Sequence, residues 1–171
     1  MSYIKKTGNY TYKEWLKKEN IHGEFLPLVK IEIFKENKFD EKRFCFESFF
    51  WNKIIKTNGV KCFNKNLRIY QMSKDSISKE LNSTSKMKQR YEDYLNYLKS
   101  FEKDYRHYNL NRELSKIYLK MAFYAWGINY KKTTLNLIIK SLEIKITFRG
   151  IMFLGLRLFG LRKQTIKYVQ G

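Results

Sequence analysis

Residues 87–105, MKQRYEDYLNYLKSFEKDY, determine how the second half of this chain folds. Apolar and aromatic side chains recur in this stretch at steps of four, three, four, three and four residues. This spacing places them along one side of an α-helix and leaves a charged opposite side. The stretch therefore predicts a long amphipathic helix, with an apolar seam made of Met87, Tyr91, Tyr94, Leu98, Phe101 and Tyr105.

Three more helical segments are expected after this helix. The first covers residues 114–125, with Asn111 as its N-cap and Gly127 as its end. The second covers residues 135–142 and should bury one side of its surface. The third falls within residues 146–169, which are rich in apolar side chains and in arginine and lysine. In the segment at residues 135–142, the side expected to be buried is formed by Leu135, Ile138, Ile139 and Leu142.

The first half of the chain has mixed character, with short apolar runs between turn residues. A run at residues 24–34 is expected to begin as a strand and to end in a helical turn. Pro27 argues against a central strand position early in this run. Asn58-Gly59 should end the helix that precedes it, since glycine suits the left-handed residue after a helix. Helices are expected at residues 10–19 and 47–57, and strands at residues 60–63 and 67–71. The fold class is therefore α+β.

The chain is strongly basic, with 35 Lys and Arg against 16 Asp and Glu among 171 residues and a formal net charge of +19. This balance excludes a protein that mimics an acidic partner. It favours an anionic partner, which is a nucleic acid, an anionic membrane surface or a phosphorylated substrate. A biased codon composition would also produce a basic chain, and that explanation stays open.

Targeting signals and covalent cross-links are not predicted. Cys45 and Cys62 are too few for a disulfide framework, and no zinc site is expected. The N-terminus has no apolar stretch typical of a secretion signal, and no run reaches the roughly 18 apolar residues of a membrane-spanning helix. The expected location is the cytoplasm.

Three segments in the first half carry a resemblance to a known family. They read TYKEWLKKENIHGEFLPLVKIEIF (11–34), FDEKRFCFESFFWNKI (39–54) and LRIYQMSKDSIS (67–78). In this order and spacing they resemble the C-terminal half of a family 2 glycosyltransferase of the bacterial surface-polysaccharide class. Three motifs in order are more specific than any one of them.

The resemblance implies the C-terminal part of a GT-A α/β domain at residues 1–82, followed by a mostly helical extension at residues 83–171. The nucleotide-binding half and its D-x-D motif are absent from this sequence. The resemblance thus implies a truncated or split enzyme or a gene fragment, whose N-terminal half is either lost or separately encoded, and a chain that is inactive alone. A divalent Mg or Mn ion is expected for the full-length family, but none is expected to bind this chain alone.

The resemblance also assigns candidate site residues. Glu47 matches the position of the presumed catalytic base, although relatives often have Glu-Asp where this chain has Glu47-Ser48. Glu47 is alternatively an ordinary first-turn acid stabilised by the helix dipole. The residues expected to bind acceptor or donor are Gly23, Glu24, Trp51 and Arg68, and Trp51 is alternatively a core residue. Asn52, next to Trp51, is expected at the helix surface without a role.

The terminal segment predicts a contact with anionic membranes at the inner face of the cell membrane. Its apolar side chains are too few and too interrupted to span a bilayer, and they suit a helix lying in the interface. The residues expected to reach anionic headgroups are Arg149, Arg157, Arg162 and Lys163. A core helix is the alternative.

For the whole chain, the rival functions are a nucleic-acid-binding protein and a non-catalytic helical adaptor. No nucleic-acid motif in the sequence supports the nucleic-acid-binding protein.

Overall fold

The structure is a computed structural model that describes residues 3–4, 7–17, 21–22, 27–37, 47–65 and 83–159. Contacts between residues divide the chain into an N-terminal unit, Met1–Asp75, and a helical unit, Ser76–Gly171. The domain boundary expected from the sequence, after residue 82, falls at the edge of segment 66–82, which lies outside the described residues.

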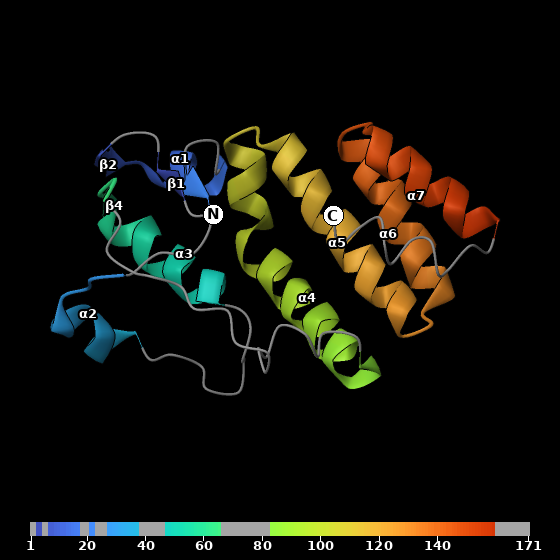
Figure 1. Cartoon of the computed structure of the whole chain (residues 1–171), viewed down its shortest axis with the longest axis horizontal. Coiled ribbons are helices and arrows are strands. Elements are labelled where there is room, and N and C mark those ends of the chain that lie inside the picture. The colour runs from blue at the N-terminus through green and yellow to red at the C-terminus, as the bar shows by residue number, and fades with distance from the viewer. Residues whose placement is uncertain are drawn as a thin grey trace. The chain divides into compact units, whose positions relative to one another are not determined.

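The N-terminal unit combines short helices with short strands (Figure 1). Its described elements, in chain order, are β1 (Tyr3–Ile4), β2 (Gly8–Tyr10), α1 (Tyr12–Lys17), β3 (Ile21–His22), α2 (Ile31–Glu36), α3 (Glu47–Asn58) and β4 (Val60–Cys62).

The described strands pair into two antiparallel sheets of two strands each. Tyr3 of β1 lies opposite His22 of β3. Gly8 of β2 lies opposite Cys62 of β4. The strand expected from residue 60 is confirmed as β4, but its partner β2 was not predicted. The expected strand at 67–71 lies outside the described residues.

A capping box starts α1. The backbone N–H and the hydroxyl of Thr11 both donate to Oε2 of Glu14 at 2.8 Å, and the Glu14 N–H donates back to Thr11 Oγ1 at 3.3 Å. These bonds satisfy N–H groups that have no partner within the helix. The hydrogen bond from the Thr11 backbone also lowers the pKa of the Glu14 carboxyl. Helix α1 confirms the central part of the helix expected at 10–19.

Helix α3 forms the centre of the N-terminal unit. It buries Phe50, Ile54 and Ile55, as its spacing predicts, and packs against α1. It ends at Asn58, and Gly59 follows with φ +68°, the left-handed conformation that glycine adopts without strain. The expected helix and its stop signal are therefore confirmed. Segment 24–34 ends as a helix, α2, while residues 23–26 lie outside the described part.

The helical unit consists, within residues 83–159, of α4 (Thr84–His107), α5 (Asn111–Gly127), α6 (Lys131–Ile144) and α7 (Phe148–Leu158). Each helix packs against the next one in the chain, and Figure 1 shows α7 at the outer side of this row. The seam predicted for α4 is largely confirmed, because Met87, Leu98, Phe101 and Tyr105 are buried. Tyr91 and Tyr94 are half-buried, and Tyr97 joins the core by a 2.8 Å hydrogen bond between its hydroxyl and that of Tyr105.

Two turns of the same construction connect α4 to α5 and α5 to α6. Asn109 and Asn129 adopt positive φ angles of 56° and 64°. The residue after each asparagine donates its N–H back into the preceding helix, from Leu110 to the Tyr105 carbonyl at 2.8 Å and from Tyr130 to the Ala125 carbonyl at 2.9 Å. This is the Schellman arrangement, which closes a helix and reverses the chain.

The expected capping role of Asn111 is wrong, because Leu110 occupies the N-cap position of α5 and no side chain caps this helix. The Schellman turn sets that boundary. Leu110 completes that turn by its bond to the Tyr105 carbonyl, and the helix begins at the next residue, Asn111.

The buried side of α6 also differs from the expectation. Thr134, Leu137, Ile138 and Ser141 are buried, whereas Ile139 is exposed. Ser141 donates to the Ser115 carbonyl at 2.9 Å, and the hydroxyls of the two serines lie 2.8 Å apart. Small hydroxyl side chains that bond across the contact let α5 and α6 approach closely, and this rotates the buried side away from Ile139.

Replacing Ser141 with alanine should lower the free energy of unfolding by about 1–2 kcal/mol, because it removes both hydrogen bonds between α5 and α6. Thermal unfolding followed by circular dichroism measures the change. Ser100→Ala, at an exposed position on α4, is the matched control and should change the stability by less than about 0.5 kcal/mol. Equal melting temperatures for the two variants would contradict a stabilising role of the serine pair.

The described residues are thus mainly helical with two small sheets, in agreement with the coarse α+β expectation. They do not display a GT-A domain. No helix among them is long and apolar enough to cross a membrane.

Candidate functional site

The residues expected to form a glycosyl-transfer site are only partly described. Gly23, Glu24 and Arg68 lie outside the described residues. Glu47 and Trp51 are described, and both belong to α3, one helical turn apart. The structure therefore places Glu47 and Trp51 on the same helix, α3. That they form one site with the three residues outside the described part stays a prediction.

Glu47 is the first residue of α3, and its side chain is exposed. The unpaired N–H groups at a helix N-terminus carry partial positive charge, which stabilises a carboxylate there. An exposed carboxylate in this position can accept a proton from a bound hydroxyl group, and it can equally serve only to stabilise the helix. Both interpretations of Glu47 from the sequence remain compatible with its location.

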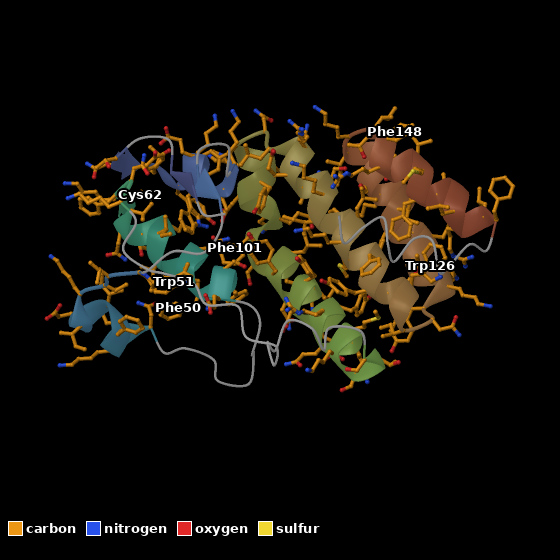
Figure 2. All side chains as sticks on the ribbon, viewed as in Figure 1. Phe50, Trp51, Cys62, Phe101, Trp126 and Phe148 are labelled. Atoms are coloured by element: carbon orange, nitrogen blue, oxygen red, sulfur yellow. The ribbon has the colours of Figure 1, made fainter. Side chains whose placement is uncertain are left out.

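Trp51 belongs to a cluster of three aromatic rings from α2 and α3. Its ring lies edge-on to Phe50 at 4.9 Å and to Phe34 at 6.4 Å between centroids. Phe34 and Phe50 are themselves 5.6 Å apart. Figure 2 shows Phe50 and Trp51 next to each other on α3. The side chain of Trp51 is half-buried, so packing is one of its roles, as the helical spacing predicts.

Asn52 is a buried polar residue, so the surface position without a role that the sequence predicts for it is wrong. Its side chain is 1% exposed, and its Oδ1 accepts a 2.7 Å hydrogen bond from the indole N–H of Trp15. Trp15 lies in the TYKEWL segment on α1, and Asn52 lies in the WNKI segment on α3. Two of the three segments that carry the family resemblance are thus joined by one hydrogen bond. An asparagine within an apolar helical run, together with a tryptophan whose N–H needs an acceptor, was the available signal.

The expected membrane-contact residues are also partly described. Arg149 is exposed on α7, whereas Arg162 and Lys163 lie outside the described residues. Arg157 is half-buried, and its guanidinium lies 5.7 Å from the centroid of the Trp126 ring on α5. Arg157 therefore lies against Trp126, whereas the sequence predicts that it reaches anionic headgroups together with Arg149.

The inner side of α7 explains the location of Arg157. Phe153 stacks on Trp126 with its centroid at 5.3 Å and an angle of 12° between the rings. Arg157 follows Phe153 by one helical turn and so lies over the same indole. Gly150 completes this side, and a Cβ atom there would lie 2.7 Å from a methyl group of Leu142. Figure 2 labels Trp126 below α7.

A charged cluster connects α4, α5 and α6 in the helical unit. Arg106 donates to Oε1 of Glu102 at 2.9 and 2.6 Å, and the Lys140 ammonium lies 4.9 Å from the Tyr118 ring. Partial burial would raise the pKa of Glu102, but the hydrogen bonds from Arg106 and Tyr118 outweigh it and the pKa falls below its usual value. The groups of this cluster satisfy one another, which suits a structural connection between helices.

Metal ligands are not grouped in the part of the chain that the structure describes: it contains no set of three His, Cys, Asp or Glu side chains able to hold an ion. The sequence also has no D-x-D motif, and the expectation that this chain alone binds no divalent metal stays a prediction. No catalytic step on this chain is assigned to a metal.

Comparison with known proteins gives no match: no family model, curated protein or solved structure is significantly similar to this chain.

Proposed function

We propose that this chain contributes the acceptor-side part of a family 2-like glycosyltransferase at the inner face of the cell membrane. The reaction would transfer a sugar from a nucleotide-sugar to a surface polysaccharide or a lipid-linked glycan. The observation that carries the proposal is the occurrence of the three family-like segments in order, two of which are connected through Trp15 and Asn52. In this proposal the N-terminal unit is the incomplete GT-A part and the helical unit is its extension.

Each candidate residue has a role in this proposal. Glu47 accepts the proton of the attacking acceptor hydroxyl, because a carboxylate is a suitable general base once substrate excludes water around it. Gly23 and Glu24 lie at the mouth of the acceptor pocket, and Trp51 lines its wall. Arg68 contacts a phosphate of the donor, a contact that the fork of a guanidinium supports. The nucleotide site belongs to a donor-binding half that these 171 residues do not contain.

A reconstitution experiment tests the proposed function. The chain alone should show no manganese-dependent binding of uridine or guanosine diphosphate sugars by calorimetry. Mixed with a donor-binding half that carries a D-x-D motif, it should transfer radiolabelled sugar to lipid-linked acceptors. Micromolar, manganese-dependent donor binding by the chain alone would contradict the division into two parts. Absence of transfer with every donor half and acceptor class tried would contradict the proposed reaction.

A further inference from the structure

The outward side of α7 is an apolar strip without charge. We define the α7 strip by Phe148, Ile151, Leu158 and Phe159, whose side chains are exposed by 76%, 54%, 70% and 80%. On a helix of 3.6 residues per turn these positions fall within one arc, with the small Gly155 between them. Ile146, just before the helix, is exposed too. Large apolar side chains that gather in one exposed patch indicate a contact surface.

The opposite side of the same helix is already occupied. Gly150 and Phe153 are buried, and Phe153 and Arg157 lie over Trp126 of α5. A rotation of α7 that buried the α7 strip would expose Phe153 and break its stacking with Trp126. The strip is therefore a second apolar side of a helix whose first side is fixed in the helical unit.

The charges around the strip select its partner. Residues 144–171 contain six Lys and Arg and no Asp or Glu, and the described helical unit, 83–159, contains fifteen against six. Lys145 and Arg149 are exposed at the start of α7. A second copy of the chain would bring the same uncompensated positive charge to this surface. An anionic surface would neutralise it, and apolar side chains would be buried at the same time.

We propose that the α7 strip docks on an anionic lipid bilayer, with α7 lying in the plane of the interface. Phe148, Ile151 and Leu158 enter the boundary between headgroups and acyl chains, while Lys145 and Arg149 contact anionic headgroups. Arg157 stays on Trp126 and does not contact lipid. This inference rests on the proposed function only for the membrane location, and binding to lipid requires neither a sugar donor nor Glu47.

Flotation of the full chain with lipid vesicles tests the docking surface. Wild-type protein should float with vesicles of phosphatidylcholine containing 30% phosphatidylserine, bind at least ten-fold less to pure phosphatidylcholine, and bind less in 0.5 M sodium chloride. Leu158→Glu should lower binding to the anionic vesicles at least ten-fold, because it places a negative charge in the strip. Leu28→Glu, at an 85% exposed position in the N-terminal unit, makes the same chemical change and should bind as the wild type does.

Controls separate loss of docking from loss of folding and from other partners. Circular dichroism should give equal melting temperatures for both leucine variants, and Ile151→Glu provides a second strip variant in case Leu158→Glu unfolds. Equal binding of the strip variants and Leu28→Glu would overturn the proposal, as would equal binding of wild type to both vesicle types. A wild-type dimer in light scattering that Leu158→Glu dissociates would assign the strip to a second copy. Wild-type vesicle binding by a Glu47→Gln chain that loses transfer when it is reconstituted with a donor-binding half would separate this surface from the proposed catalytic role.

Discussion

Replacing Asn52 with leucine should lower the free energy of unfolding of the N-terminal unit by about 2–4 kcal/mol. The substitution removes the acceptor of the 2.7 Å hydrogen bond from Trp15 and fills a fully buried polar position with a differently shaped side chain. Urea denaturation followed by tryptophan fluorescence measures the effect. Trp126→Phe as the background leaves Trp15 and Trp51, so that the remaining emission reports on the N-terminal unit alone.

Asn64→Leu is the matched control for this experiment. Asn64 is exposed, and its backbone N–H, which the substitution retains, donates to Thr7 Oγ1 at 2.8 Å. Its stability should therefore stay within about 0.5 kcal/mol of the background. If both leucine variants unfold at the same urea concentration, the bond between Trp15 and Asn52 contributes nothing measurable. Such a result would leave the two family-like segments without an energetic connection.

In an enzyme reconstituted with a donor-binding half, Glu47→Gln should lower kcat by roughly 100-fold or more and change donor binding little. Glutamine keeps the size and hydrogen-bonding shape of glutamate and removes its basicity. Because Glu47 is exposed, the substitution should change the stability by less than about 0.5 kcal/mol. Steady-state rates at saturating labelled donor and acceptor measure kcat, and donor titrations measure binding separately.

Glu32→Gln serves as the control, since Glu32 is likewise an exposed acid in the first turn of a helix, α2. It should keep the wild-type rate. Wild-type turnover by Glu47→Gln together with loss of turnover in Glu24→Gln would move the base from Glu47 to Glu24. Equal losses in Glu47→Gln and Glu32→Gln would assign the effect to helix-terminus charge and not to proton transfer.

Periodicity predicted the helices well because their spacing is a local property of the sequence. The α4 seam and the existence of the helices described in residues 83–159 follow from it, while the end of α3 follows from Asn58-Gly59. The buried side of α6 did not follow, since a pair of serines from two helices decides it. The pairing of β4 with β2 was missed for a similar reason, because strand partners distant in sequence leave no periodic signal.

The candidate site was harder to predict than the fold. The sequence pattern brought Glu47 and Trp51 to one helix, and the structure agrees. It did not identify Asn52, because a lone asparagine in a helix is usually at the surface. The pattern also predicted that Arg157 reaches headgroups together with Arg149. Helical pitch alone cannot show that Trp126 of α5 lies under Arg157.

The pairing of β2 with β4 has a consequence for the order in which the two units fold. In the helical unit each helix packs on its neighbour through a connection of a few residues, so most contacts close short loops. In the N-terminal unit Gly8 meets Cys62, and Trp15 meets Asn52, across long stretches of chain. Long loops lose more entropy on closure, and local topologies fold faster. When the denatured full chain refolds, β2 stays unpaired until the long loop to β4 closes, so the helical unit is expected to complete its folding before the N-terminal unit.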